Sequence, residues 1–129
     1  MVGNLPYNIG TRLLVKLITE VPQIHRYVVM LQDEVAERMV AMPNTKQYGS
    51  LSVLASLFTN TKIQFNVSKN CFEPKPKKNL GQNFLIDTNI SRKITKLVQG
   101  QLADPIIEIG PGTGSVSYTH LTLPTIYSV

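Results

Sequence analysis

The chain has 129 residues, which allows one ordinary domain. Its formal net charge is +5, which suits a polyanionic partner such as nucleic acid or simply aids solubility. Its single cysteine, Cys71, excludes an internal disulfide and a cysteine-based metal site, and neither histidine stands in a ligand-like cluster. Because no apolar stretch approaches the roughly 20 residues that span a bilayer and no signal peptide opens the chain, we expect a cytoplasmic monomer that binds neither metal nor membrane.

The first forty residues predict alternating strands and helices. Residues 1–3 have the character of a strand end, and residues 10–21 carry apolar side chains at helical spacing. Residues 27–31 form a continuous apolar run, which is typical of a buried parallel strand. Asp33 is placed to cap the helix that follows this strand.

The next stretch predicts a loop, a helix and a strand. Turn-forming residues mark a loop over 43–49, and apolar side chains at 51–58 indicate a further helix. Ile63, Phe65 and Val67 then alternate with polar residues as in a strand.

The remainder of the chain repeats the pattern after a connector rich in proline and lysine at 73–78. Asp87 is placed to cap a helix, whose expected buried face consists of Ile90, Ile94, Leu97 and Val98. Residues 106–109 are a short apolar strand. Because strands alternate with helices throughout, the sequence predicts an α/β fold with a mainly parallel sheet and flanking helices.

A glycine loop follows the last of these strands and reads EIGPGTG at 108–114. Glycines at alternate positions allow a tight turn and close approach of the backbone to a ligand. The loop lacks the lysine of a phosphate-binding P-loop, and its spacing differs from the dinucleotide pattern G-x-G-x-x-G. With its preceding acid, it resembles the first motif of class I methyltransferases, which packs against the methionine part of S-adenosylmethionine. A plain glycine-rich turn is the alternative.

The motif Asn4-Leu5-Pro6-Tyr7 follows the first expected strand and resembles a motif of amino-methyltransferases that act on nucleic acid. Adenine N6 is a poor nucleophile because its lone pair is delocalised into the ring. The Asn4 side-chain oxygen and the Leu5 carbonyl can accept its two N–H groups, and Pro6 stiffens the backbone that presents them. Tyr7 offers a flat face to an extruded base, a contact worth roughly 1–3 kcal/mol. This chemistry works by positioning and needs no metal, although an ordinary Asn-Pro turn is the alternative.

Six stretches together resemble the ribosomal RNA adenine dimethyltransferases of the KsgA type and their Erm-type relatives. They read NLPYNIGTRLL at 4–14, LQDEVAERMVA at 31–41, YGSLSVL at 48–54, FEPKPK at 72–77, KNLGQNFLID at 78–87 and EIGPGTG at 108–114. The resemblance implies a Rossmann-like sheet that binds S-adenosylmethionine and transfers its methyl groups to adenines of small-subunit ribosomal RNA.

The resemblance also implies roles for individual positions. Phe72 would stack on the target adenine opposite Tyr7, with a core phenylalanine as the alternative. The expected cofactor-binding residues are Gln82, Asn83, Leu85, Glu108, Gly110, Gly112, Gly114 and Asn4. The candidate contacts to RNA phosphates, each of which could instead be a solvated surface charge, are Arg12, Lys75, Lys77 and Lys78.

The order of the motifs departs from the family. There GQNFL comes first, the glycine loop next and NLPY much later, with intervening strands that are absent here, one of which ends in the acid that binds the ribose. In that fold the strands before EIGPGTG and NLPY are neighbours, so we expect residues 106–109 to pair with the first residues, with 27–31 beyond them. The glycine loop, Asn4–Tyr7, Phe72 and Asn83 would then face one crevice.

We interpret residues 1–77 as resembling the later half of the catalytic domain, and 78–115 as resembling its N-terminal half with the cofactor loop. Residues 116–129 are expected to be a non-native tail, because VSYTHLTLPT matches a translated sequencing adapter. We therefore expect a family member with little or no activity as this chain. The alternatives are a non-catalytic RNA-binding remnant and a different nucleotide-binding α/β protein.

Overall fold

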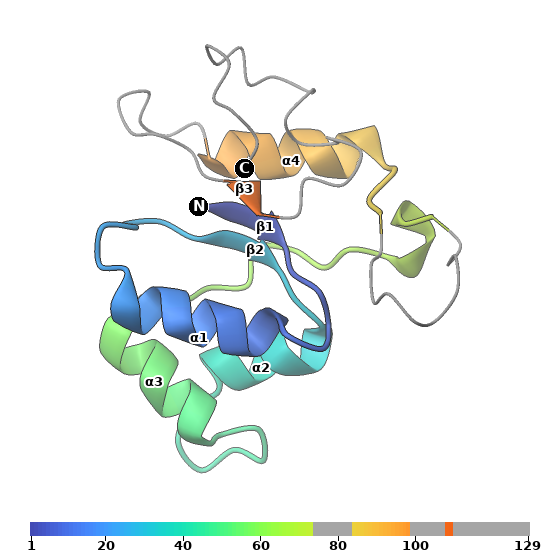
Figure 1. Ribbon diagram of the computed structural model, residues 1–129. Coiled ribbons are helices and arrows are strands. Elements are labelled where there is room, and N and C mark those ends of the chain that lie inside the picture. Colours follow the sequence, from blue (N-terminus) through green and yellow to red (C-terminus); the bar gives the residue numbers. More distant parts are fainter. Residues whose placement is uncertain (74–83, 99–107, 110–129) are drawn as a thin grey trace.

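A three-stranded sheet lies at the centre of the computed structural model, which describes residues 1–73, 84–98 and 108–109 (Figure 1). Its strands stand in the order β2-β1-β3 and are β1 (Val2–Asn4), β2 (Val28–Met30) and β3 (Glu108–Ile109). β1 is parallel to both neighbours, with Gly3 opposite Val29 on one side and Ile109 on the other. The expected parallel sheet and its strand neighbours are thus confirmed, although residues 106–107 lie outside the described residues.

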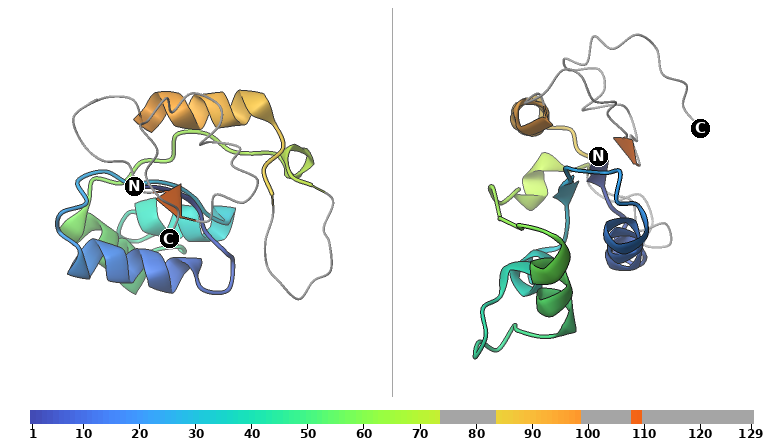
Figure 2. Two further views of the ribbon diagram at one scale, coloured as in Figure 1. Left: turned by 45° about the horizontal axis from the view of Figure 1, so that its top comes forward. Right: turned by 90° about the vertical axis from the view of Figure 1, so that its left-hand side faces the viewer.

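Helices cover both faces of the sheet. One face carries α1 (Gly10–Glu20), α2 (Asp33–Val40) and α3 (Ser50–Phe58), and the other carries α4 (Thr88–Val98), as Figures 1 and 2 show. The expected helices and the α/β class are confirmed. Within the described part of the chain, no helix is long and apolar enough to cross a membrane.

The first core cluster lies between the sheet and helices α1–α3. Its buried members are Leu5, Leu14, Met39, Leu51 and Ala55. Leu14 is 2% exposed, and full burial of such a side chain contributes about 1.5–3 kcal/mol. Ser52 ties α3 to α2, because its Oγ donates to the Arg38 carbonyl at 2.5 Å and accepts from the Gly49 amide at 3.1 Å.

The second core cluster lies between the sheet and α4 and centres on Val2, Leu85 and Ile94. α4 begins as expected, since the Asp87 carboxylate accepts the backbone N–H groups of Asn89 at 2.8 Å and Ile90 at 3.2 Å. Three of the four residues expected on its buried face, Ile90, Ile94 and Val98, belong to this cluster or pack against it.

Ile94 is buried, as expected for the face of α4, whereas Ile90, Leu97 and Val98 are only half-buried. Ser91 and Thr95 take the most buried positions instead. Both hydroxyls donate to carbonyls one turn earlier, Ser91 to Asp87 at 3.1 Å and Thr95 to Ser91 at 2.9 Å. Hydrogen bonding within the helix removes most of the cost of burying these groups, so two polar residues share the inner face with Ile94, and Ile90 and Val98 pack on the same cluster.

The expectation that Asp33 caps α2 is wrong. Asp33 is the first residue of the helix, and Gln32 is the N-cap without a side-chain cap bond. The Gln32 carbonyl accepts from the amides of Val35 and Ala36, each at 3.0 Å. Asp33 lies in the first turn, where its charge still interacts favourably with the helix dipole.

The expected strand at 63–67 is also wrong, since this segment joins no sheet in the part of the chain that the structure describes. Its side chains do alternate in burial: Phe65 and Val67 pack on the cluster beneath α4, whereas Ile63 is 46% exposed. Alternation predicts which side chains turn inward, but a ladder also needs a strand edge within reach of the backbone.

Candidate active site

The ends of β1 and β3 meet at one edge of the sheet. β1 ends at Asn4 and β3 at Ile109, and because the strands are parallel their carboxyl ends open on the same side. Close approach is possible because position 3 is glycine: a Cβ there would lie 3.3 Å from the Ile109 carbonyl oxygen. The motif at 4–7 therefore begins beside the strand that leads to Gly110.

Local packing holds the motif in place after β1. Leu5 is 2% exposed and its amide donates to the Met30 carbonyl at 3.4 Å. The Gly10 amide donates to the Pro6 carbonyl at 2.7 Å, which closes the turn into α1. A Cβ on Gly10 would lie only 2.8 Å from the Leu5 Cβ, so glycine is required where the helix starts.

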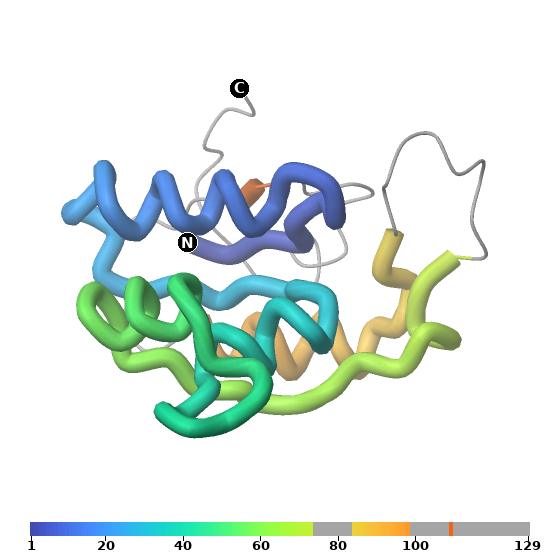
Figure 3. Tube along the Cα trace, turned by 90° about the horizontal axis from the view of Figure 1, so that it is seen from below, coloured from blue at the N-terminus to red at the C-terminus, as the bar shows by residue number. Residues whose placement is uncertain are grey.

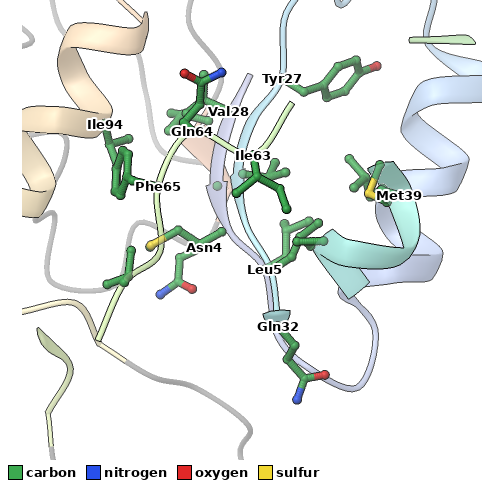
Figure 4. A pocket seen from close by; sticks show the side chains of 18 of the residues that line it. Asn4, Leu5, Tyr27, Val28, Gln32, Met39, Ile63, Gln64, Phe65 and Ile94 are labelled. Carbon is green, nitrogen blue, oxygen red and sulfur yellow. The ribbon is translucent and has the colours of Figure 1, made fainter. Parts of the chain in front are cut away.

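The motif presents polar groups at the edge of the sheet. Asn4 is half-buried, and its side chain points to the other side of β1 from that of Leu5 (Figure 4). The Pro6 carbonyl already accepts a hydrogen bond, whereas no donor among the described residues reaches the Leu5 carbonyl. Tyr7 is 46% exposed. The tyrosine ring is therefore exposed at this edge, whereas Leu5 is almost fully buried.

Phe72 and Leu85 lie opposite each other in an antiparallel bridge. Two backbone bonds flank it: the Glu73 amide donates to the Phe84 carbonyl and the Ile86 amide to the Cys71 carbonyl, each at 2.9 Å. Leu85 is 5% exposed and belongs to the core, and the half-buried Phe72 packs against the same cluster. Phe72 therefore makes the contacts of a core phenylalanine, which was the alternative to a role in stacking on the target adenine.

One wide cleft of about 1870 Å³ connects these positions. Its lining includes all four residues of the motif at 4–7, together with Phe72 and Leu85. It also includes Met30, Gln32 and Phe65, which the sequence did not single out. Gln32 follows the end of β2 just as the motif follows β1, so the rule that ligands bind beyond the carboxyl ends of parallel strands would have found it.

Asp87 and Cys71 form a hydrogen-bonded titratable pair near the bridge. Backbone hydrogen bonds from Ile90 and Asn89 lower the pKa of Asp87 below its usual range. Burial raises the pKa of the Cys71 thiol, and its hydrogen bond to Asp87 Oδ2 at 3.5 Å adds to this. Cys71 is therefore held as a thiol, the form that is the weaker nucleophile.

The other candidate residues are distributed as follows. Arg12 is exposed on α1, and Glu108 lies in β3 opposite Val2. The candidates outside the described residues are Lys75, Lys77, Lys78, Gln82, Asn83, Gly110, Gly112 and Gly114. Over residues 1–73, 84–98 and 108–109, no group of three or more His, Cys, Asp or Glu side chains could hold a metal ion.

Comparison with known proteins points to one family. The family described as ribosomal RNA adenine dimethylase matches residues 1–80 and, in a second segment, residues 77–121. The two matches overlap at the connector, and the second ends inside the segment 116–129 that was expected to be non-native. No solved structure matches the chain.

Similar curated proteins are named ribosomal RNA small subunit methyltransferase A. The one from Chlamydia caviae is 40% identical over 107 residues, covering 77% of this chain and 38% of that protein. Those from Chlamydia felis and Clostridium botulinum (strain Okra) are 51% and 49% identical over 77 residues, or 59% and 60% of this chain. The chain spans only 27% to 38% of the length of these relatives.

Proposed function

Because the chain belongs to the ribosomal RNA adenine dimethylase family, we propose that the shared edge of β1 and β3 is part of a Rossmann-like site for methylation of adenine N6 in small-subunit ribosomal RNA. The observation that carries this proposal is the parallel pairing of Gly3 with Ile109. It brings the motif at 4–7 beside the strand that enters the glycine loop.

In this proposal Asn4 and Leu5 hold the amine that accepts the methyl group. The Asn4 side-chain oxygen and the Leu5 carbonyl each accept one N–H of adenine N6. The half-buried position of Asn4 at the end of β1 supports this role, as does the place of both residues in the lining of the cleft. Tyr7 and Phe72, which line the same cleft, contact the two faces of the extruded base. These residues act by orientation.

S-adenosylmethionine fits this edge because ligands of parallel sheets bind beyond the carboxyl ends of their strands. When bound, it would supply an electrophilic methyl group on a sulfonium centre. The residues proposed to hold it are Gln82, Asn83, Leu85, Glu108, Gly110, Gly112, Gly114 and Asn4. Leu85 is so deeply buried that its role would be to support the cofactor site from beneath.

The proposal keeps the division of the chain into residues 1–77, 78–115 and a non-native tail at 116–129. The bridge between Phe72 and Leu85 supports it, because it joins the end of the first segment to the start of the second. Pairing of β1 with β3 supports it as well, since it places side by side two strands from opposite ends of the chain.

We further propose that the 129-residue chain transfers methyl groups weakly or not at all. The strands that stand between the glycine loop and the NLPY motif in the family, one of which ends in the acid that binds the ribose, are absent from the sequence. The chain covers only 38% of the length of the Chlamydia caviae relative, which agrees with weak or no activity. A non-catalytic RNA-binding protein is the second candidate, and the positive net charge of the chain favours it.

Methyl transfer to a small-subunit RNA fragment, followed with S-adenosylmethionine labelled in its methyl group, tests the proposal. The full-length Chlamydia caviae relative serves as positive control, and Asn4→Ala in this chain sets the background. We expect incorporation by the chain to be at or slightly above that background. Incorporation approaching that of the relative would contradict the proposed loss of activity. Incorporation that is clear but unchanged in Asn4→Ala would contradict the assigned site.

A further inference from the structure

Five exposed cations gather on the side of the molecule covered by α4. Three lie on α4, one on the extended segment beside it and one at the start of the short 3-10 helix Lys69–Cys71; this basic face consists of Lys62, Lys69, Arg92, Lys93 and Lys96. Arg92 and Lys93 lie four and three residues before Lys96, so the three are neighbours on the helix surface. α4 contains no acidic residue.

An aromatic side chain lies within this face. The ring of Phe65 is half-buried, and the Lys93 Nζ lies 5.6 Å from its centroid, a cation–π geometry. Phe65 also packs against the cluster beneath α4, which places the extended segment alongside the helix. Figures 2 and 3 show the two side by side, the segment in yellow-green and α4 in orange.

The positive charge is concentrated on this side of the sheet. Residues 59–73 and 84–98 carry five basic and two acidic residues, whereas residues 1–58 carry five basic and four acidic ones. None of the five cations forms a salt bridge within the part of the chain that the structure describes. One of the two acids, Asp87, already accepts two backbone N–H groups at the start of α4.

We propose that this basic face binds the phosphate backbone of RNA. Lys62 and Lys69 line the same cleft as Asn4 and Phe72, so a strand held on the face leads toward the edge of the sheet. Contacts to phosphates fix the position of a protein on nucleic acid without reading its sequence. The inference rests on the proposed function in one respect, that RNA is the substrate.

Binding of a fluorescein-labelled small-subunit RNA hairpin, followed by fluorescence anisotropy over a series of salt concentrations, tests this inference. The test variant is Arg92→Gln/Lys93→Gln/Lys96→Gln. The control variant, Lys16→Gln/Arg38→Gln/Lys46→Gln, removes the same charge from exposed positions on the other side of the sheet. Circular dichroism establishes that both variants remain folded.

Each lost phosphate contact should reduce the slope of log Kobs against log salt by about 0.7–0.9. We therefore expect the test variant to lose roughly two units of slope and to bind at least about tenfold more weakly at low salt, while the control keeps most of the parent's affinity. Equal losses in both variants would show that only net charge matters and would overturn the inference. Unchanged binding in the test variant would overturn it as well.

This experiment needs neither cofactor nor methyl transfer, so its outcome is separate from that of the proposed function. RNA binding that depends on the basic face, in a chain that does not bind S-adenosylmethionine, would remove the proposed active site and leave this inference standing. Methyl transfer by the chain, with unchanged RNA affinity in the test variant, would support the proposed active site and overturn the inference about the basic face.

Discussion

Gly3 is paired in register with Ile109 in a parallel sheet, although the two residues come from opposite ends of the described chain. The pair sets β1 against β3 and leaves their carboxyl ends on one edge. Because the contact depends on matching backbones and apolar side chains rather than on chain order, β1 and β3 lie side by side although their motifs stand in an unusual order in the sequence.

Substitution of Gly10 by alanine tests the packing that holds the motif at 4–7. The new Cβ would lie 2.8 Å from the Leu5 Cβ, so either α1 or Leu5 must shift. Overpacking of this kind costs about 1–3 kcal/mol in the free energy of unfolding, measured by urea denaturation. The control is Gly49→Ala, where a Cβ meets nothing within 4 Å. Equal effects at the two positions would argue against the close contact between Gly10 and Leu5.

Asp87 should make the stability of the chain depend on acid pH. Its pKa is lowered in the folded state, so its contribution is present above the unfolded pKa of about 3.9 and is lost as pH falls through the lower folded pKa. We expect Asp87→Ala to lower the urea midpoint at pH 7 and to flatten its decline below pH 4. Asp33→Ala, at a position without a cap bond, should have a smaller effect. A larger effect at Asp33 would reverse the assignment of the caps.

S-adenosylmethionine should bind this chain more weakly than it binds the full-length Chlamydia caviae relative. The strand whose acid is expected to bind the ribose is absent, and a charge-assisted hydrogen bond of that kind is worth roughly 1.5–3 kcal/mol. Titration calorimetry on the two proteins in one buffer should therefore show at least a tenfold difference in Kd. Equal affinities would mean that the cofactor site is intact without that strand.

Removal of residues 116–129 should leave thermal stability unchanged or improved. These residues were interpreted as a non-native tail, and such a tail contributes no packing to the core. Differential scanning calorimetry of the chain with and without the segment measures the effect. A loss greater than about 2 kcal/mol, the scale of a real core contribution, would contradict the interpretation.

Sequence periodicity predicted the helices and strands of this fold more reliably than the residues at which the helices begin. The apolar spacing at 10–21 and the apolar run at 27–31 correspond to α1 and β2. The spacing indicates one buried face of a helix, and the continuous run indicates a strand that packs on both faces, as Val29 and Met30 do. Asp87 immediately precedes α4 and caps it, whereas Asp33 is already the first residue of α2 and does not cap it. The two starts differ by one residue, which the helical spacing of apolar side chains does not specify.

The candidate site could be predicted in part for the same reason. The motif at 4–7 was evident in the local sequence, whereas the strand beside it was expected only because the two strands are neighbours in the fold of the family that the sequence resembles. The bridge between Phe72 and Leu85 did not, since an antiparallel contact depends on how the chain returns after the connector. The strand expected at 63–67 failed because alternation does not identify a pairing partner.

The most direct test of the central claim is a measurement of nuclear Overhauser contacts between the backbone protons of Gly3 and Ile109 in solution. The account predicts interstrand contacts between them, together with slow hydrogen exchange of the amides that join β1 to β3. It would be contradicted if β1 showed contacts only to β2 and the amides that join β1 to β3 exchanged as rapidly as in an unfolded chain.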